Sequence, residues 1–178
     1  MSENEEQLLD AEGLKRTLQR MAFQIVEGRS RTAPLQFVGI RSRGYPIALR
    51  LAETVKAEFG LDIPVGAVDI TLYRDDLHKT NRWPVLLGTQ IPFELDGADV
   101  VLVDDVLFTG RTVRAALNTI CDLGRPSRVR LAVLVDRGHR EIPIQPDIVG
   151  LSVKTRWEQR VKARVKPIDG SDEVVQVV

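Results

Sequence analysis

Apolar residues recur at helical spacing in three segments of the chain. In the first segment the pattern follows Asp10, a residue type that commonly caps a helix, and it stops at Gly28. We expect two further helices at about 46–59 and 113–123, each with a glycine directly after it. Residues 1–9 are mostly polar and lack this spacing, so we expect a disordered tail there. The apolar positions of the first helix are Leu14, Leu18, Met21, Ala22 and Ile25.

Short apolar runs between these helices predict β-strands. The strongest is Val100–Val103, and three others are expected at 35–40, 65–72 and 129–135. Because strands alternate with helices, we expect a single α/β domain over residues 1–178 with a mostly parallel central sheet. Weaker strand candidates lie at 148–151, 161–165 and 174–178.

Charged loops follow three of the predicted strands, at 41–44, 104–112 and 136–141. Ligands of such sheets bind beyond the carboxyl ends of the strands, so these loops point to one shared cleft. Residues 73–90 are polar and contain Pro84 and Gly88. We expect a long mobile loop or hairpin there, a feature that often serves as an active-site lid.

Composition narrows the function classes. The 178 residues contain 25 Lys and Arg and 25 Asp and Glu, and this balance excludes a protein that coats nucleic acid by bulk charge, although not a local basic face. One cysteine and two histidines exclude a disulfide framework and disfavour a metal site rich in those residues. The chain suits a reducing cytoplasm, and we expect Cys121 to be a small buried residue. No apolar run approaches the ~18 residues that a membrane span needs, so we expect no membrane partner.

The segment Val100–Thr112 has the sequence VVLVDDVLFTGRT, which combines a strand, two acids and a loop of small residues before a helix. Free backbone N–H groups and the positive end of a helix dipole bind phosphate, and Gly110 lets the backbone approach it closely. Asp104 and Asp105 suit hydroxyl groups or a Mg²⁺-bound ligand, so a sugar phosphate with vicinal hydroxyls fits both features. An exposed turn or the acidic pocket of a response regulator would also place two acids at a strand end. Neither explains Thr-Gly-Arg-Thr before a helix.

This segment resembles the 5-phosphoribosyl-1-pyrophosphate (PRPP) motif of the type I phosphoribosyltransferases. The resemblance implies a mostly parallel sheet flanked by helices, with a flexible loop and a small hood, and an enzyme that uses Mg²⁺ carried by PRPP near Asp104 and Asp105. It also implies that these two acids are catalytic and bind the ribose hydroxyls. The loop that would cradle PRPP and its 5-phosphate comprises Val106, Leu107, Phe108, Thr109, Gly110, Arg111 and Thr112.

Three other segments resemble one branch of that family, which combines uracil phosphoribosyltransferase activity with control of pyrimidine operons. They are 69–77 (DITLYRDDL), 122–134 (DLGRPSRVRLAVL) and 133–144 (VLVDRGHREIPI). The resemblance implies that uracil and PRPP are converted to UMP and pyrophosphate. It further implies UMP or UTP as effectors, leader mRNA as a partner, and a homodimer or homotetramer. A regulator with weak or no transferase activity, or a purine phosphoribosyltransferase, remains an alternative.

The resemblance assigns pyrophosphate binding to the loop after the first predicted strand. The family usually has Thr where this chain has Ser42, which keeps the hydroxyl, and Arg43 suits charge-assisted contacts with pyrophosphate; a solvated turn is the alternative. Arg74, in the expected flexible loop, would be catalytic by neutralising the leaving pyrophosphate, unless it belongs to a salt-bridged hairpin. We expect His78 to be solvated, and no residue is an obvious strong general base. The pyrophosphate set is Arg41, Ser42, Arg43 and Gly44.

Base recognition would fall to the hood, where backbone groups could match the donors and acceptors of uracil. Arg137 could stack over the base or hold the phosphate side, and His139 is either a base contact or structural. The expected base-binding residues are Asp136, Arg137, Gly138 and Val153.

A basic face for RNA is expected in two places. Residues 160–166 alternate cations with Val and Ala, so a strand would place the cations on one face, and the first helix carries a second basic strip. The alternative is a solvated strand face balanced by acids elsewhere. Gln19 and Phe23 stand where the family usually has Thr and His. The RNA candidates are Lys15, Arg16, Arg20, Arg160, Lys162 and Arg164.

Overall fold

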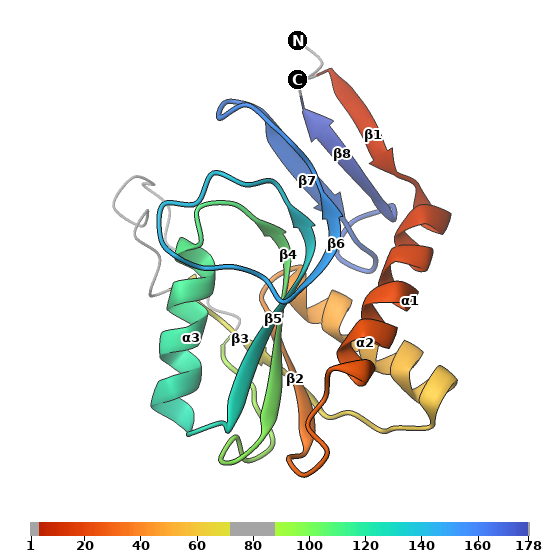
Figure 1. Ribbon diagram of the computed structural model, residues 1–178. Coiled ribbons are helices and arrows are strands. Elements are labelled where there is room, and N and C mark those ends of the chain that lie inside the picture. Colours follow the sequence, from red (N-terminus) through yellow and green to blue (C-terminus); the bar gives the residue numbers. More distant parts are fainter. Residues whose placement is uncertain (1–3, 72–87, 178) are drawn as a thin grey trace.

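The computed structural model describes residues 4–71 and 88–177. Its central sheet has five parallel strands in the order β3-β2-β4-β5-β6. Helices α1 and α2 cover one face of this sheet and α3 covers the other (Figure 1). The expected α/β fold with a mostly parallel sheet is therefore confirmed. The strands are β2 (Leu35–Ile40), β3 (Val65–Val68), β4 (Asp99–Leu107), β5 (Arg128–Asp136) and β6 (Ile148–Ser152), and the helices are α1 (Ala11–Glu27), α2 (Gly44–Phe59) and α3 (Arg111–Leu123).

A second, antiparallel sheet, here called the small sheet, has the order β1-β8-β7 and does not include residues 136–138 and 153, to which the hood was assigned. Its strands are β1 (Glu5–Leu9), β7 (Arg160–Arg164) and β8 (Glu173–Val177). Both ends of the chain meet in this sheet (Figure 1). The expectation of a disordered tail over residues 1–9 is wrong for Glu5–Leu9, because β8 supplies the backbone partners that a tail would lack.

The local signals set the helix boundaries closely. The Asp10 carboxylate accepts a hydrogen bond from the Gly13 N–H at 2.7 Å, and Gly28 ends the helix by donating to the Gln24 carbonyl. Helix α2 begins at Gly44 and α3 at Arg111, each two residues before the expected start. Strand β4 runs on to Leu107, so Asp104 and Asp105 lie within the strand rather than in a loop after it.

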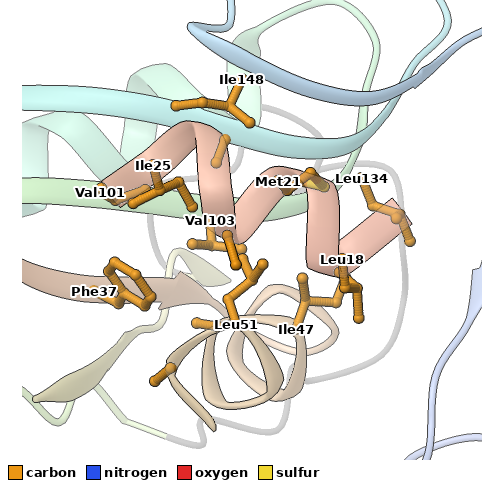
Figure 2. Packing of buried hydrophobic residues seen from close by; sticks show 14 of the residues in the cluster. Leu18, Met21, Ile25, Phe37, Ile47, Leu51, Val101, Val103, Leu134 and Ile148 are labelled. Carbon is orange, nitrogen blue, oxygen red and sulfur yellow. The ribbon is translucent and has the colours of Figure 1, made fainter. Parts of the chain in front are cut away.

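The larger apolar core joins α1 and α2 to the sheet. Figure 2 shows Met21 and Ile25 of α1, Ile47 and Leu51 of α2 and Phe37 of β2 in one cluster of side chains, all with at most 1% of their surface exposed. A second core lies under α3. Strand β2 pairs with β3 on one side and β4 on the other, so the strand order reverses at β2. That reversal opens a crevice at the carboxyl ends of β2 and β4.

Candidate active site

A cavity of about 280 Å³ lies at this crevice. It joins the loop after β2, the segment after β3, the carboxyl end of β4 and the start of α3. Of the three loops expected to share one cleft, 41–44 and 104–112 contribute to this cavity, whereas 136–141 does not line it. Its lining consists of Arg41, Ser42, Arg43, Asp69, Ile70, Thr71, Asp104, Asp105, Val106 and Thr112.

The two acids of the central motif are placed by β4. Asp104 is 5% exposed and Asp105 is partly exposed, and the Asp105 N–H donates to the Asp104 carboxylate at 2.9 Å. Asp69 brings a third carboxylate to the cavity, and it accepts from the Thr71 N–H at 2.9 Å. Asp69 and Thr71 were not predicted as cavity residues, because both fell inside the strand expected at 65–72, whereas β3 ends at Val68.

The Arg41–Gly44 loop presses directly on β4. A Cβ on Gly44 would lie 2.4 Å from the Val103 carbonyl oxygen and 3.2 Å from the Asp104 Cα, so only glycine permits this approach. The contact fixes the loop relative to the acid pair. The side chain of Arg43 is 38% exposed and lines the cavity, and Asp169 binds it through two hydrogen bonds of 2.9 and 2.8 Å. Those bonds raise the pKa of Arg43 above its ordinary value.

Arg41 and Asp69 hold the residues that flank segment 72–87. Arg41 donates from Nε to the Gly88 carbonyl at 3.1 Å and from Nη2 to the Gln90 side-chain oxygen at 3.0 Å. Asp69 accepts from the Gly88 N–H at 3.0 Å. The chain therefore leaves and rejoins the fold beside the cavity. Arg74 and His78, with the expected flexible loop, lie outside the described residues.

The loop between β4 and α3 has the geometry of a phosphate-binding turn. Gly110 has φ of 91°, a conformation that favours glycine, and α3 begins directly after it. Backbone N–H groups at this helix start have the orientation that suits a phosphate. Thr112 lines the cavity, whereas Arg111 is held by Glu141 at 2.5 Å.

Val106 and Thr112 of the expected PRPP loop line the cavity, whereas Thr109, Gly110, Arg111, Leu107 and Phe108 do not. Leu107 is 2% exposed and belongs to the core under α3. The ring of Phe108 packs against Trp157 and beneath Arg137, whose guanidinium carbon lies 4.0 Å from the ring centroid. Any role of these two residues in ligand binding therefore falls to their backbone.

The expected base-binding segment is held by its own hydrogen bonds. The Asp136 carboxylate accepts from the Gly138 N–H at 2.9 Å and from Arg140 at 2.7 Å, and the Asp136 carbonyl accepts from the Val153 N–H at 2.9 Å. His139 contacts the Thr155 carbonyl at 2.7 Å through Nε2. This contact favours the structural interpretation of His139.

Arg137 is 6% exposed, and burial lowers its pKa. Its guanidinium donates to the Thr155 hydroxyl and to the carbonyls of Arg156 and Trp157, at 3.2 to 3.3 Å. These bonds and the Phe108 ring engage the side chain within the protein. These contacts tie residues 155–157 to the loop after β4 and give no support to a contact with a base or phosphate, which stays a prediction.

Strand β7 confirms the predicted alternation but not a free cationic face. Val161 and Ala163 are buried, and the cations lie on the other face. Arg164 pairs with Glu5 at 2.6 Å and with Glu173 at 2.9 Å, and Lys162 pairs with Glu5 at 3.6 Å. These ion pairs with acids of β1 and β8 support the alternative of a strand face balanced by acids, and RNA contact by Lys162 and Arg164 stays a prediction.

The basic strip of α1 is divided. Arg20 donates to the carbonyls of Val149 and Gly150, so its guanidinium is used within the fold. Lys15 and Arg16 are exposed, as is Arg160 of β7. Phe23 is 49% exposed and meets Phe59 of α2 edge to face, with ring centroids 4.8 Å apart.

Three further expectations concern metals, the cysteine and membranes. Within residues 4–71 and 88–177, no group of three or more His, Cys, Asp and Glu side chains could hold a metal ion. Cys121 is exposed, so the expectation of a buried cysteine is wrong. Of the helices that the structure describes, none combines the length and apolarity of a membrane span.

Comparisons with known proteins identify the family. Residues 4–164 match the model of the phosphoribosyl transferase domain. The protein named bifunctional protein PyrR from Pelotomaculum thermopropionicum is 51% identical over 175 residues, covering 98% of this chain and 97% of the relative. That of Chloroflexus aurantiacus is 53% identical over 172 residues, covering 97% and 94%. A solved hypoxanthine phosphoribosyltransferase from Trypanosoma cruzi has a TM-score of 0.74 at 16% identity, over 99% of this chain and 96% of that one, which shows a shared fold. The chain therefore belongs to the phosphoribosyltransferase family, among the relatives of bifunctional protein PyrR.

Proposed function

We propose that this chain transfers the phosphoribosyl group of PRPP to uracil, giving UMP and pyrophosphate, in the cytoplasm. The observation that carries the proposal is that the loop after β2, the carboxyl end of β4 and the start of α3 line one cavity. Acids at the end of β4 face the arginine loop of β2, and Thr112 at the start of α3 closes the same space. An acid pair for vicinal hydroxyls, a helix start for a phosphate and arginines for pyrophosphate are the three elements that PRPP needs.

The reaction breaks the bond between the ribose C1 and a pyrophosphate oxygen and forms a bond from C1 to uracil N1. Asp104 and Asp105 would bind the ribose hydroxyls, and the backbone from Thr109 to Thr112 would hold the 5-phosphate. Arg43 would bind the departing pyrophosphate. Uracil N1–H is fairly acidic, so correct positioning lets the proton leave to a cavity carboxylate or to water without a strong base.

Mg²⁺ would reach this site with PRPP. Three carboxylates line the cavity, from Asp69, Asp104 and Asp105, and oxygen donors of this kind suit Mg²⁺. The cation would lie near Asp104 and Asp105, with pyrophosphate oxygens and water as its main ligands. The cation would neutralise charge on the leaving group.

The test offers uracil, cytosine, guanine, hypoxanthine and adenine in parallel to the protein with PRPP and Mg²⁺. We expect turnover with uracil alone. The double variant Asp104→Asn, Asp105→Asn should lose turnover and keep its fold by circular dichroism, while the control Asp62→Asn, on the connection after α2, should match the wild type. Preference for guanine or hypoxanthine would identify a purine enzyme and reject the proposal. Full activity of the double variant would reject the site.

We further propose that the chain regulates pyrimidine genes by binding leader mRNA, with UMP or UTP as effector. The bifunctional naming of its relatives supports this role. The exposed cations Lys15, Arg16 and Arg160 are the residues on which it would rest here. RNA binding should tighten with UMP, weaken with salt, and fall when either Lys15 or Arg16 becomes Glu, with Lys56→Glu as the charge-matched control. Light scattering would show whether the chain is the expected homodimer or homotetramer.

A further inference from the structure

The turn between β7 and β8 reaches back to the pyrophosphate loop through one carboxylate. Asp169 accepts from Arg43 Nε at 2.9 Å through one oxygen and from Nη2 at 2.8 Å through the other. Residues 43 and 169 are 126 positions apart, so this contact exists only because the small sheet folds over the carboxyl end of β4. A two-bond fork fixes the plane of a guanidinium as well as its position.

The Asp169 carboxylate is also held by the backbone of its own turn. The Val165 N–H donates to Asp169 Oδ2 at 2.8 Å, and the Asp169 N–H donates to the Val165 carbonyl at 3.0 Å. Its side chain is 17% exposed. Hydrogen bonds from Arg43 and Val165 outweigh the opposing effect of burial and keep the pKa of Asp169 below its ordinary value. The anchor is thus charged near neutral pH and has little freedom to rotate.

Arg43 lies between two cavities. It lines the 280 Å³ cavity with Asp104 and Thr112, and it also lines a neighbouring cavity of about 350 Å³ with Asp105 and Asp169. The fork uses Nε and Nη2, and among the described residues no hydrogen bond is recorded for Nη1. A free arginine has several flexible torsions, and ordering it on ligand binding costs entropy.

We propose that Asp169 is a positioning residue that holds the Arg43 guanidinium ready for the pyrophosphate group of PRPP. This inference rests on the proposed transferase function and extends it to a residue of the small sheet that the PRPP motif does not include. Asp169 acts only through Arg43 and does not touch the reacting atoms.

The same turn supplies a matched control. Asp172 binds Arg50 of α2 through two hydrogen bonds of 2.9 and 3.0 Å, and it accepts from the Lys166 N–H at 2.9 Å. Both pairs, Arg43–Asp169 and Arg50–Asp172, therefore join the β7–β8 turn to α2 or the residue before it through two hydrogen bonds between a guanidinium and a carboxylate. Arg50 lines neither of the two cavities that Arg43 lines. A purely structural role for the turn would make the two aspartates equivalent.

The experiment compares Asp169→Asn with Asp172→Asn in the full chain. Steady-state kinetics give KM for PRPP and for uracil, and calorimetric titration of pyrophosphate with Mg²⁺ gives its Kd without turnover. We expect Asp169→Asn to raise KM for PRPP and Kd for pyrophosphate about tenfold and to leave KM for uracil unchanged. Asp172→Asn should change none of the three while lowering Tm by a similar amount. In an Arg43→Ala background, Asp169→Asn should have no further effect.

Several outcomes would overturn the proposal. Unchanged pyrophosphate affinity in Asp169→Asn would show that the fork does not position Arg43. Tighter pyrophosphate binding in Asp169→Asn would show that Asp169 competes with pyrophosphate instead. Equal losses of pyrophosphate affinity in Asp169→Asn and Asp172→Asn would show that the turn has only a structural role. If Asp169→Asn does not fold, Asp169→Glu keeps the charge but moves the carboxylate, and it should weaken pyrophosphate binding in the same direction. A wild type that binds pyrophosphate but transfers to no base would refute the transferase function alone, since the titration would still test Asp169.

Discussion

Replacement of Gly44 by alanine tests whether the close approach of the Arg41–Gly44 loop to β4 sets the geometry of the active site. The added Cβ would lie 2.4 Å from the Val103 carbonyl oxygen, whereas an ordinary contact is 3.4 Å or more. Both nearest groups belong to the β4 backbone, which cannot rotate away as a side chain could. The backbone of Gly44 does not have positive φ, so alanine is allowed conformationally and the effect is purely steric.

The magnitude follows from that overlap. Relieving it requires the loop and β4 to separate by about 1 Å, and strain of this kind in a packed interior costs roughly 1–3 kcal/mol. The same shift moves Arg43 relative to Asp104, and a misplacement of about 1 Å between catalytic groups can cost roughly a hundredfold in rate. We therefore expect Gly44→Ala to fold, with a modestly lower Tm, and to lose about a hundredfold in kcat.

The control is Gly60→Ala, at the other end of α2. Gly60 has φ of 67° and no neighbour within 4 Å of an added Cβ, so alanine there costs about 1 kcal/mol of backbone strain and no overlap. Both variants should lower Tm, measured by calorimetry, but only Gly44→Ala should lose uracil turnover. If Gly44→Ala keeps more than about a third of the wild-type kcat, the reasoning from steric contact is refuted. An equal loss in Gly60→Ala would attribute the effect to α2 stability instead.

Two further predictions concern buried charges far apart in the fold. Asp99 is fully buried and binds Arg128 and Arg130. We expect Asp99→Asn to lower the free energy of unfolding, measured in urea, by about 3–5 kcal/mol, because the charge of Arg130 stays buried without its partner. A change as small as that of the exposed Asp62→Asn would contradict this prediction. Burial opposes ionisation of Asp99, but hydrogen bonds from Arg128 and the Ser30 N–H lower its pKa. The contribution of ionised Asp99 to the free energy of unfolding is therefore present above about pH 4 and is lost as pH falls through the lowered pKa. This acid-dependent loss of stability should be absent in Asp99→Asn. Arg137→Lys keeps the charge but loses the flat stack on Phe108 and its forked donation, so we expect a lower Tm and faster proteolysis at 153–159; wild-type values for both would refute the bracing role.

Sequence patterns predicted the elements whose signals are local. Asp10 and Gly28 bound α1 because capping involves groups only three or four residues away. The central motif located the acids and the helix start for the same reason. Strand β1 could not be predicted, because EEQLL has no alternation and its partner β8 is about 170 residues away in the sequence.

The loops of the candidate site were predicted from the sequence, but the contacts that hold those loops from distant parts of the chain were not. Neighbouring sequence shows that Arg43 follows a strand, but nothing near it indicates that Asp169 will face it. The cations of β7 were placed on the correct face, yet their pairing with Glu5 and Glu173 depends on two other strands of the small sheet. Arginine is a residue type that often binds ligands, so the sequence alone suggests such a role for Arg137. Its stacking on Phe108 and its hydrogen bonds to three acceptors depend on the fold.

The contacts of Arg43 and Arg137 give the small sheet and its connections a role in positioning the loops of the candidate site. Each of the two sets of contacts is here called a brace. Arg43, the residue proposed to bind pyrophosphate, is tied to the β7–β8 turn, and Phe108, in the loop proposed to bind the 5-phosphate, is tied through Arg137 to residues 155–157. The chain passes from one brace to the other through β7 alone, between Trp157 and Asp169. A shift of β7 would therefore move both sets of contacts together and couple the geometry of Arg43 to that of Phe108. If this coupling operates, Asp169→Asn should also alter the protection of amide hydrogens at 108–112, whereas Asp172→Asn should not.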